Sequence, residues 1–126
     1  MKESPGPVDY RFRRIERLRG KKEIEKVFRD GRRFGFAGVK LFVLGNGFEY
    51  NRICFTFPRK YGNAVERNRA RRLSRETYRL LRPRLKGGFD LVLLVYPPRK
   101  DETFPPRKEQ LAVLFTKAGL FMETKK

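Results

Sequence analysis

The chain has 126 residues, of which 32 are Lys or Arg and 14 are Asp or Glu, and its formal net charge at pH 7 is +18. A chain of this length forms one domain with one modest hydrophobic core. The charge favours a polyanionic partner, with nucleic acid as the first candidate and an anionic membrane surface as the second. The longest apolar run, residues 91–96, is far shorter than the ~20 residues that a membrane span requires.

Two absences limit the chemistry that the side chains can perform. The sequence has no His, which excludes a histidine base, a Ser-His-Asp triad and an imidazole metal ligand. Its one cysteine, Cys54, excludes an internal disulfide and a cysteine-based zinc finger, and fits a reducing, cytoplasmic compartment. No hydrophobic stretch follows the first residues, so we expect no signal peptide. We also expect no catalytic residue, no metal ligand and no cofactor on the protein alone.

The first half of the chain predicts a tail, a helix and strands. Residues 1–9 contain Pro and Gly and are expected to be a disordered tail, followed by a single domain over 10–126. Apolar spacing predicts a short helix from Lys21 to Asp30, ended by Gly31. Residues 34–44 read as extended, and residues 45–47 predict a turn. Residues 52–58 alternate, which predicts a strand with Ile53, Phe55 and Phe57 on its core face and Cys54 and Thr56 on the other.

The most basic part of the chain is residues 59–86, where 11 Lys or Arg stand against two Glu. Asn63 is a good helix N-cap, and Glu66 three residues later completes a variant of the capping box. Pro83 ends the helix near Arg82, because the residue before a proline avoids the helical conformation. The sequence therefore predicts a helix of about five turns over this segment.

A step of about 100° per residue divides this predicted helix into two faces. We expect the core face to consist of Val65, Ala70, Leu73, Thr77, Leu80 and Leu81. The opposite side, called the arginine face below, consists of Arg67, Asn68, Arg71, Arg72, Arg75, Arg79 and Arg82. Arg69 and Glu76 fall near the apolar edge and are interpreted as a local ion pair, with Glu66 nearby.

The choice of Arg over Lys on this face favours a bound anion over simple solvation. A planar guanidinium can hold a phosphate through two hydrogen bonds or stack on a base, whereas Lys would serve solubility equally well. Arginines spaced four apart also repel one another by a few tenths of a kcal/mol per pair. A helix that tolerates this repulsion is better explained by an anionic ligand than by a solvated charged face.

The last third of the chain completes the predicted fold. Residues 89–96 are almost wholly apolar, as in a central strand covered on both sides. Residues 97–106 hold four prolines and predict a surface loop, before an amphipathic helix marked by Leu111, Leu114, Phe115, Ala118 and Met122. Because a helix separates the strands at 52–58 and 89–96, we expect these strands to be parallel. The fold class is α/β, a sandwich built on a single mixed sheet of the four-stranded type with helices packed against it.

One segment carries a resemblance to a known family. It reads Arg59-Lys60-Tyr61-Gly62-Asn63-Ala64-Val65-x-Arg67-Asn68-Arg69-x-Arg71-Arg72-Leu73-x-Arg75-Glu76 and resembles the signature of the bacterial ribonuclease P protein component. The resemblance extends to Arg17-Leu18-Arg19, to Val27-Phe28-x-x-Gly31 and to Gly88-Phe89-Asp90-Leu91-Val92, and covers about residues 15–122. Two positions depart from the pattern. Ile24 stands where many members carry a second aromatic residue, and Pro58 stands where Ser is common.

The resemblance implies both a fold and a function. It implies a left-handed strand–helix–strand crossover, against the usual rule, and a role as the subunit that pairs with a large catalytic RNA. That RNA, with its own magnesium ions, cleaves the 5′ leader from precursor tRNA; neither DNA nor a membrane is an expected partner. The implied RNA contacts are Arg59, Lys60, Arg67, Asn68, Arg69, Arg71, Arg72 and Arg75. The implied leader-binding cleft, between the first helix and one sheet face, contains Phe28, Phe42, Cys54 and Thr56.

Two other functions stay open at this point. A ribosomal-type structural RNA-binding protein suits the size, charge and fold equally well, and lacks only an effect that depends on a precursor leader. A free-standing nuclease would need clustered carboxylates with a metal ion, and its candidates, Glu66, Glu76, Asp90 and Asp101, show no clustering in the sequence. For either Phe of the cleft, ordinary core packing competes with stacking on an RNA base, which is worth ~1–3 kcal/mol per base.

Overall fold

The computed structural model of the chain describes residues 13–123, so the tail predicted at residues 1–9 lies outside the described residues. In chain order its elements are η1 (Arg14–Glu16), α1 (Lys21–Asp30), β1 (Arg32–Phe36), β2 (Val39–Gly45), β3 (Arg52–Thr56), α2 (Ala64–Leu81), η2 (Arg82–Arg84), β4 (Phe89–Val95) and α3 (Arg107–Lys117). The two helices predicted from caps and spacing, α1 and α2, form as expected.

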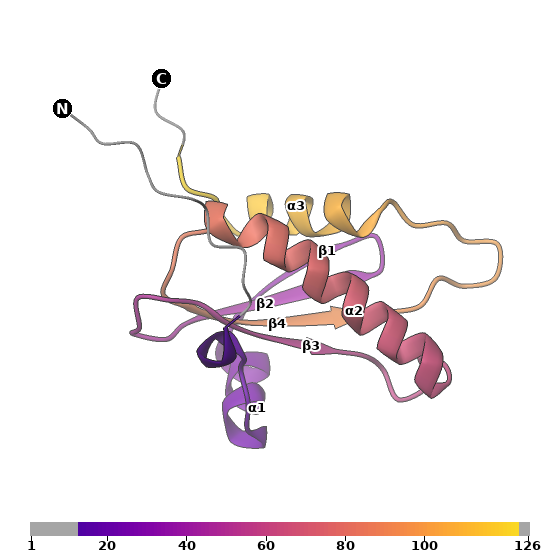
Figure 1. Cartoon of the computed structure of the whole chain (residues 1–126), viewed down its shortest axis with the longest axis horizontal. Coiled ribbons are helices and arrows are strands. Elements are labelled where there is room, and N and C mark those ends of the chain that lie inside the picture. The colour runs from indigo at the N-terminus through magenta and orange to yellow at the C-terminus, as the bar shows by residue number, and fades with distance from the viewer. Residues whose placement is uncertain (1–12, 124–126) are drawn as a thin grey trace.

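The four strands form the single mixed sheet that was predicted, and their order is β1-β2-β4-β3. β2 pairs antiparallel with both β1 and β4, and β3 pairs parallel with β4. Figure 1 shows α2 and α3 on one face of the sheet and α1 on the opposite face. The parallel pair is joined through α2, and the left hand of this crossover stays a prediction from the resemblance.

Residues 34–44 are not one extended segment, because a tight hairpin turn at Ala37 and Gly38 divides them into β1 and β2. Both turn residues have positive φ, 44° and 80°, which matches a two-residue turn whose twist suits a hairpin. A Cβ on Gly38 would lie 2.3 Å from Cζ of Phe104, in the loop before α3. The hairpin therefore holds the 97–106 loop against the sheet through a contact that only glycine permits.

We expect Gly38→Ala to lower the free energy of unfolding by about 1–3 kcal/mol, because Phe104 must move away from the added methyl group. Urea denaturation measures the change. Gly47→Ala is the matched control, since Gly47 also has a positive φ, 79°, but no atom within 4 Å of the added Cβ. Equal losses in the two variants would show that backbone strain alone, and not the packing of Phe104, explains the effect.

The core has two layers, one on each sheet face. Between the sheet and the α2–α3 pair, Tyr78 is fully buried, with its ring centroid 6.1 Å from that of Phe55 and 6.2 Å from that of Phe115. Under α1, a smaller cluster joins Leu18, Val27, Phe42 and Val92 and is flanked by Ile24, Phe28 and Cys54. The predicted alternation of β3 is confirmed, since Ile53 and Phe55 belong to the first layer and Cys54 to the second.

The predicted core face of α2 was right for three residues and wrong for three. Ala70, Thr77 and Leu81 are buried as predicted, but Val65, Leu73 and Leu80 are 63%, 48% and 49% exposed. Ser74 and Tyr78 complete the buried face. Burial is possible for the hydroxyls because they are hydrogen-bonded: Ser74 accepts from Nη1 of Arg107 at 2.7 Å, and Thr77 donates to the carbonyl of Leu73 at 2.8 Å.

The last helix is shorter than its apolar spacing predicted. α3 ends at Lys117, and Met122, expected on its core face, lies beyond the helix and is 52% exposed. Gly119 ends the helix with a φ of 70°, and the N–H of Leu120 donates to the carbonyl of Phe115 at 2.9 Å, as in a glycine C-cap. The other apolar positions of this helix are buried as predicted: Leu111, Leu114, Phe115 and Ala118.

Candidate nucleic-acid interface

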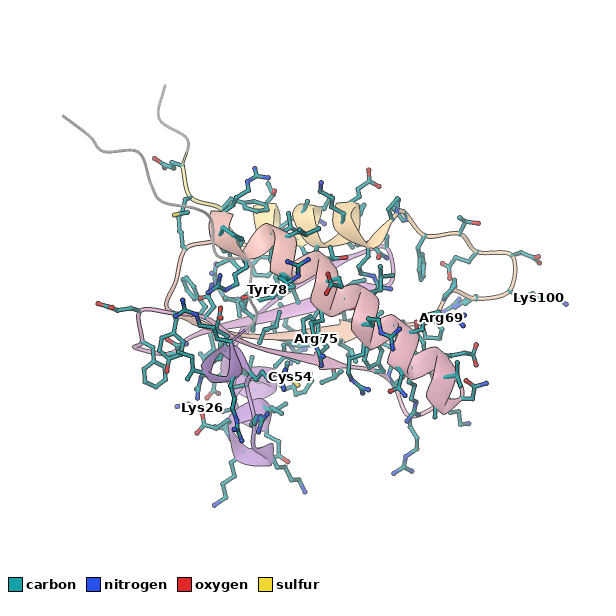
Figure 2. The ribbon with its side chains drawn as sticks, in the orientation of Figure 1. Lys26, Cys54, Arg69, Arg75, Tyr78 and Lys100 are labelled. Atoms are coloured by element: carbon teal, nitrogen blue, oxygen red, sulfur yellow. The ribbon has the colours of Figure 1, made fainter. Side chains whose placement is uncertain are left out.

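The start of α2 is fixed by the predicted capping box. Oδ1 of Asn63 accepts from the N–H of Glu66 at 2.8 Å, and the N–H of Asn63 donates to Oε1 of Glu66 at 3.1 Å. The expected ion pair of Arg69 with Glu76 is wrong, because Glu76 instead pairs with Arg79 at 2.9 Å, three residues along the helix. Arg69 lies on the side of α2 that faces the 97–106 loop (Figure 2).

The arginine face carries a half-buried row, Arg67, Arg71 and Arg75, beside a fully exposed Asn68 and Arg72. The guanidinium of Arg71 lies 5.3 Å from the ring centroid of Phe57 and donates to Oδ1 of Asn68 at 3.2 Å. Nε of Arg67 and Nε of Arg75 are buried and have no hydrogen-bond acceptor among the described residues. A buried guanidinium donor without an acceptor is costly, so this row gains from an external anion.

Two members of the arginine face already have carboxylate partners. Arg82 pairs with Glu16, which is 3% exposed, and this contact holds η1 against the end of α2. Arg79 pairs with Glu76, as described above. The other cations of this surface have no carboxylate partner among the described residues, and they lie nearer the N-terminus of the helix. There the carbonyl of Arg59 accepts a hydrogen bond from Nη2 of Arg67. These cations are the predicted contacts Arg59, Lys60, Arg67, Arg71, Arg72 and Arg75.

The structure brings the predicted cleft residues Phe28 and Phe42 together. Their ring centroids lie 4.7 Å apart in an edge-to-face arrangement. Phe42 is 6% exposed, whereas Phe28, on α1, is only half-buried. The guanidinium of Arg33 also lies 5.8 Å from the Phe42 ring centroid. Phe42 is therefore largely covered by its neighbours, and Phe28 is the more accessible of the two rings.

Cys54 and Thr56 lie half-buried on the same sheet face as Phe42, as predicted. The hydroxyl of Thr56 donates to the carbonyl of Leu93 at 3.4 Å. Burial raises the pKa of the Cys54 thiol, and the positive charge of Arg71 opposes this rise. Arg71 lies over Phe57, directly after the edge strand β3, so the arginine face borders the strand that carries Cys54 and Thr56. Figure 2 shows Arg75 on the side of α2 toward Cys54.

The sequence reasoning missed two cations on the cleft side of the sheet. Arg33 and the exposed Lys40 line a pocket of about 180 Å³ beside Phe42, and the ammonium of Lys40 lies 5.4 Å from the ring centroid of Tyr96. The signal was present, because Lys40 is two residues from Phe42 in a strand and so shares its face. These residues extend the basic lining of the cleft toward the edge strand β1.

The carboxylates proposed for a free-standing nuclease do not gather in one place. Glu66 caps α2, Glu76 pairs with Arg79, and Asp90 accepts from Nη2 and Nε of Arg52 at 2.6 and 2.8 Å. Within residues 13–123 no three Asp, Glu or Cys side chains form a group that could hold a metal ion. Over the same residues, no helix has the length and apolar character to cross a membrane.

The sequence of the chain matches a known family. A family model described as Ribonuclease P matches residues 12–119. The chain belongs to the ribonuclease P protein family. It is 34% identical over 116 residues to the ribonuclease P protein component of Dictyoglomus thermophilum, which covers 90% of this chain and 97% of that protein. It is 42% identical over 80 residues to the ribonuclease P protein component of Natranaerobius thermophilus, and the match covers 64% of this chain and 70% of that protein.

Solved structures of ribonuclease P proteins share the fold. The protein from Thermotoga maritima superimposes with a TM-score of 0.70 at 27% identity, covering 86% of this chain and 99% of that one. The protein from Staphylococcus aureus gives a TM-score of 0.75 at 20% identity, and the match covers 85% of this chain and 98% of that one. At this identity the likeness supports the fold alone. The resemblance drawn from the motif is therefore confirmed. As a ribonuclease P protein, the chain is a subunit of an endoribonuclease of tRNA processing, with the ribonuclease P RNA as its partner.

Proposed function

We propose that this subunit binds the ribonuclease P RNA through the arginine face of α2 and the 5′ leader of precursor tRNA in the cleft between α1 and the sheet. The observation that carries the proposal is geometric: Arg71 on the helix lies over Phe57, directly after the edge strand β3, and β3 carries Cys54 and Thr56 on its other face. One molecule can therefore hold the catalytic RNA and the substrate side by side. Each surface has chemistry suited to its ligand.

The arginine face suits a phosphate backbone. Arg67, Arg71 and Arg75 form a row along one side of α2, and two of their Nε donors are buried without an acceptor. Guanidinium groups bind phosphate oxygens through paired, charge-assisted hydrogen bonds. Arg59, Lys60, Asn68 and Arg72 extend the same basic surface as further proposed contacts, and Arg69 is a proposed contact on the side of α2 that faces the 97–106 loop.

The cleft suits an unpaired strand of variable sequence. Phe28 offers a ring for stacking, and stacking depends little on the identity of the base. Arg33 and Lys40 supply charge beside Phe42, while Cys54 and Thr56 form a half-buried floor whose Thr hydroxyl is already used by Leu93. A surface with few free hydrogen-bonding groups selects little between different bases. A leader of variable sequence must be bound in this tolerant way.

We assign the hydrolysis itself to the RNA subunit and its magnesium ions, with no catalytic residue or cofactor on the protein. The dispersed carboxylates and the absence of His support this assignment. The role of the protein is then to hold substrate and catalyst in register, which lowers the entropic part of the barrier. A cytoplasmic location, where both RNAs are expected to meet, stays a prediction.

The first test is cleavage of a precursor tRNA by a bacterial ribonuclease P RNA at low magnesium, with and without this protein. We expect a large stimulation that disappears when the 5′ leader is shortened to one or two nucleotides. Stimulation that is independent of leader length would leave RNA-subunit binding intact and remove the leader from the proposal. Tight RNA binding without any stimulation would favour a purely structural RNA-binding role.

We expect Phe28→Ala to reduce the preference for precursor over mature tRNA by about 5- to 100-fold, because one stacking contact with the leader is lost. Affinities of the assembled ribonucleoprotein for the two tRNAs give this ratio. Phe48→Ala is the control, because Phe48 is 46% exposed in the loop between β2 and β3 and lies in neither proposed surface. If Phe28→Ala weakens binding of the RNA subunit just as strongly, Phe28 has a packing role instead.

A further inference from the structure

A second basic site lies on the other side of α2 from the cleft. A pocket of about 260 Å³ opens between α2 and the start of α3, lined by Tyr61, Glu66, Arg69, Ala70, Leu73, Pro97, Pro98 and Arg107. Figure 2 shows Arg69 directed toward the loop that bears Lys100, which is the loop that closes this side. Neither Arg107 nor Tyr61 belongs to the arginine face or to the cleft.

Arg107 is a partly buried cation with uncharged acceptors. Its Nε donates to Oε1 of Gln110 at 2.9 Å and its Nη1 donates to Oγ of Ser74 at 2.7 Å. Both acceptors are themselves buried, at 2% and 0% exposed, so they fix the guanidinium in place. Burial lowers the pKa of Arg107, and a hydrogen bond with Tyr61 opposes this effect. Arginine stays protonated in proteins, so the cation is held by uncharged acceptors, and among the described residues no carboxylate forms an ion pair with it.

One carboxylate, Glu66, also lines the pocket. Glu66 accepts from the N–H of Asn63 as part of the capping box, and it balances only one of the two arginines. A buried charge is costly unless an opposite charge and hydrogen bonds offset that cost. Arg69 brings a second guanidinium to the same pocket, and Tyr61 brings a hydroxyl group. Two guanidinium groups with a hydroxyl are a typical set of ligands for a phosphate group.

We propose that this pocket binds one phosphate group of an RNA strand, with Arg107 and Tyr61 as fixed ligands and Arg69 closing over it. The inference rests on the proposed function, in which the RNA binds to α2 and Arg69 is one of its contacts. It places that contact of Arg69 on the side of α2 away from the leader. It adds two ligands, Arg107 and Tyr61, that are not among the RNA contacts implied by the resemblance. The catalytic RNA would then contact α2 on both sides, through the arginine face and through this pocket. Inorganic phosphate carries the same chemistry and serves as the probe.

The test follows the Nε–Hε signals of arginine by NMR while the intact wild-type protein is titrated with sodium phosphate at constant ionic strength. We expect the Arg107 and Arg69 signals to shift together along one saturating curve. Arg99, exposed in the neighbouring loop, reports general screening and is expected to shift little and without saturation. An Arg107 signal that moves no more than that of Arg99 would overturn the proposal.

Two variants separate a built site from general attraction to a basic protein. Arg69→Gln is expected to weaken phosphate binding about tenfold, since it removes one charge-assisted ligand. Lys108→Gln removes the same charge from an exposed position of α3 that does not line the pocket, and is expected to change binding less than twofold. Equal losses in both variants would overturn the proposal.

Addition of ribonuclease P RNA to the labelled protein distinguishes the source of the phosphate. We expect the RNA to shift the Arg107 signal in the same direction as phosphate and to prevent any further shift on phosphate addition. If phosphate still shifts Arg107 in the RNA complex, the site takes a free anion and the RNA part of the proposal is wrong. Failure of the RNA to bind at all is seen in the same sample as unshifted Arg71 and Arg75 signals. It would contradict the proposed function and, with it, the RNA part of this inference.

Discussion

Replacement of both Arg71 and Arg75 by Gln is expected to weaken binding of the ribonuclease P RNA by about 10- to 100-fold. Both side chains lie half-buried in the row that borders the cleft, where each can hold a phosphate. The slope of log affinity against log salt concentration should fall by about 1.5–2, since two fewer phosphates are neutralised. Filter binding of the RNA over a range of salt concentrations measures both quantities.

The same variant separates RNA binding from folding. Arg71 and Arg75 are four residues apart and repel each other, so their removal relieves a few tenths of a kcal/mol and offsets the lost contact of Arg71 with Phe57. We therefore expect weaker RNA binding with nearly unchanged stability. The charge-matched control is Arg99→Gln with Lys108→Gln, at two exposed sites away from α2. If the salt slope falls by the same amount in the control, the contacts are not on the arginine face.

The second large effect is on stability. We expect Asp90→Ala to lower the free energy of unfolding by about 3–5 kcal/mol, because it leaves a charged Arg52 without its buried partner. Asp90 is 4% exposed and accepts from Arg52 through both carboxylate oxygens, at 2.6 and 2.8 Å, and from Nδ2 of Asn46 at 3.0 Å. The ion pair joins β3 to β4 and braces the loop after β2. Chemical denaturation followed by circular dichroism measures the loss.

A double variant tests the cause of this loss. Arg52→Met combined with Asp90→Ala removes both charges, so it should recover part of the stability that Asp90→Ala loses. Glu25→Ala, at an exposed site on α1, is the control and should change stability by less than about 0.5 kcal/mol. A loss below about 1 kcal/mol for Asp90→Ala would mean that water reaches Arg52 and replaces the carboxylate.

The parts of this fold that follow from local rules were predictable. Asn63 and Glu66 fix the start of α2, Pro83 limits its end, and the alternation of residues 52–56 places Cys54 and Ile53 on opposite sheet faces. The parts that depend on tertiary contacts were not. The hydroxyls of Ser74 and Thr77 are buried because hydrogen bonds satisfy them, and no periodicity of apolar residues shows this. The hairpin at Ala37 and Gly38 was missed because both flanking segments have strand character.

The site was predictable to the same degree. Helical geometry identified the arginine face. It could not show that Arg82 forms an ion pair with Glu16, which lies 66 residues earlier in the chain. The placement of α1 against the sheet, which creates the cleft, came from family resemblance and not from physical chemistry, because no residue pattern specifies which face a short helix covers. Arg107 was not considered, because a single arginine after a prolyl loop gives no signal in sequence. Only the fold shows that its charge is partly buried.

The position of Cys54 allows ligand binding to be followed through the reactivity of its thiol. It is the only thiol in the chain, so an alkylating reagent has a single target, at the boundary of the two proposed RNA surfaces. Its raised pKa keeps the thiol protonated and slow to react at neutral pH, so alkylation is best followed at mildly alkaline pH, where more thiolate is present. A bound leader would shield the sulfur, whereas a shorter leader would leave it open. The rate of alkylation therefore reports the fraction of protein molecules that hold a leader, without a label or a substitution.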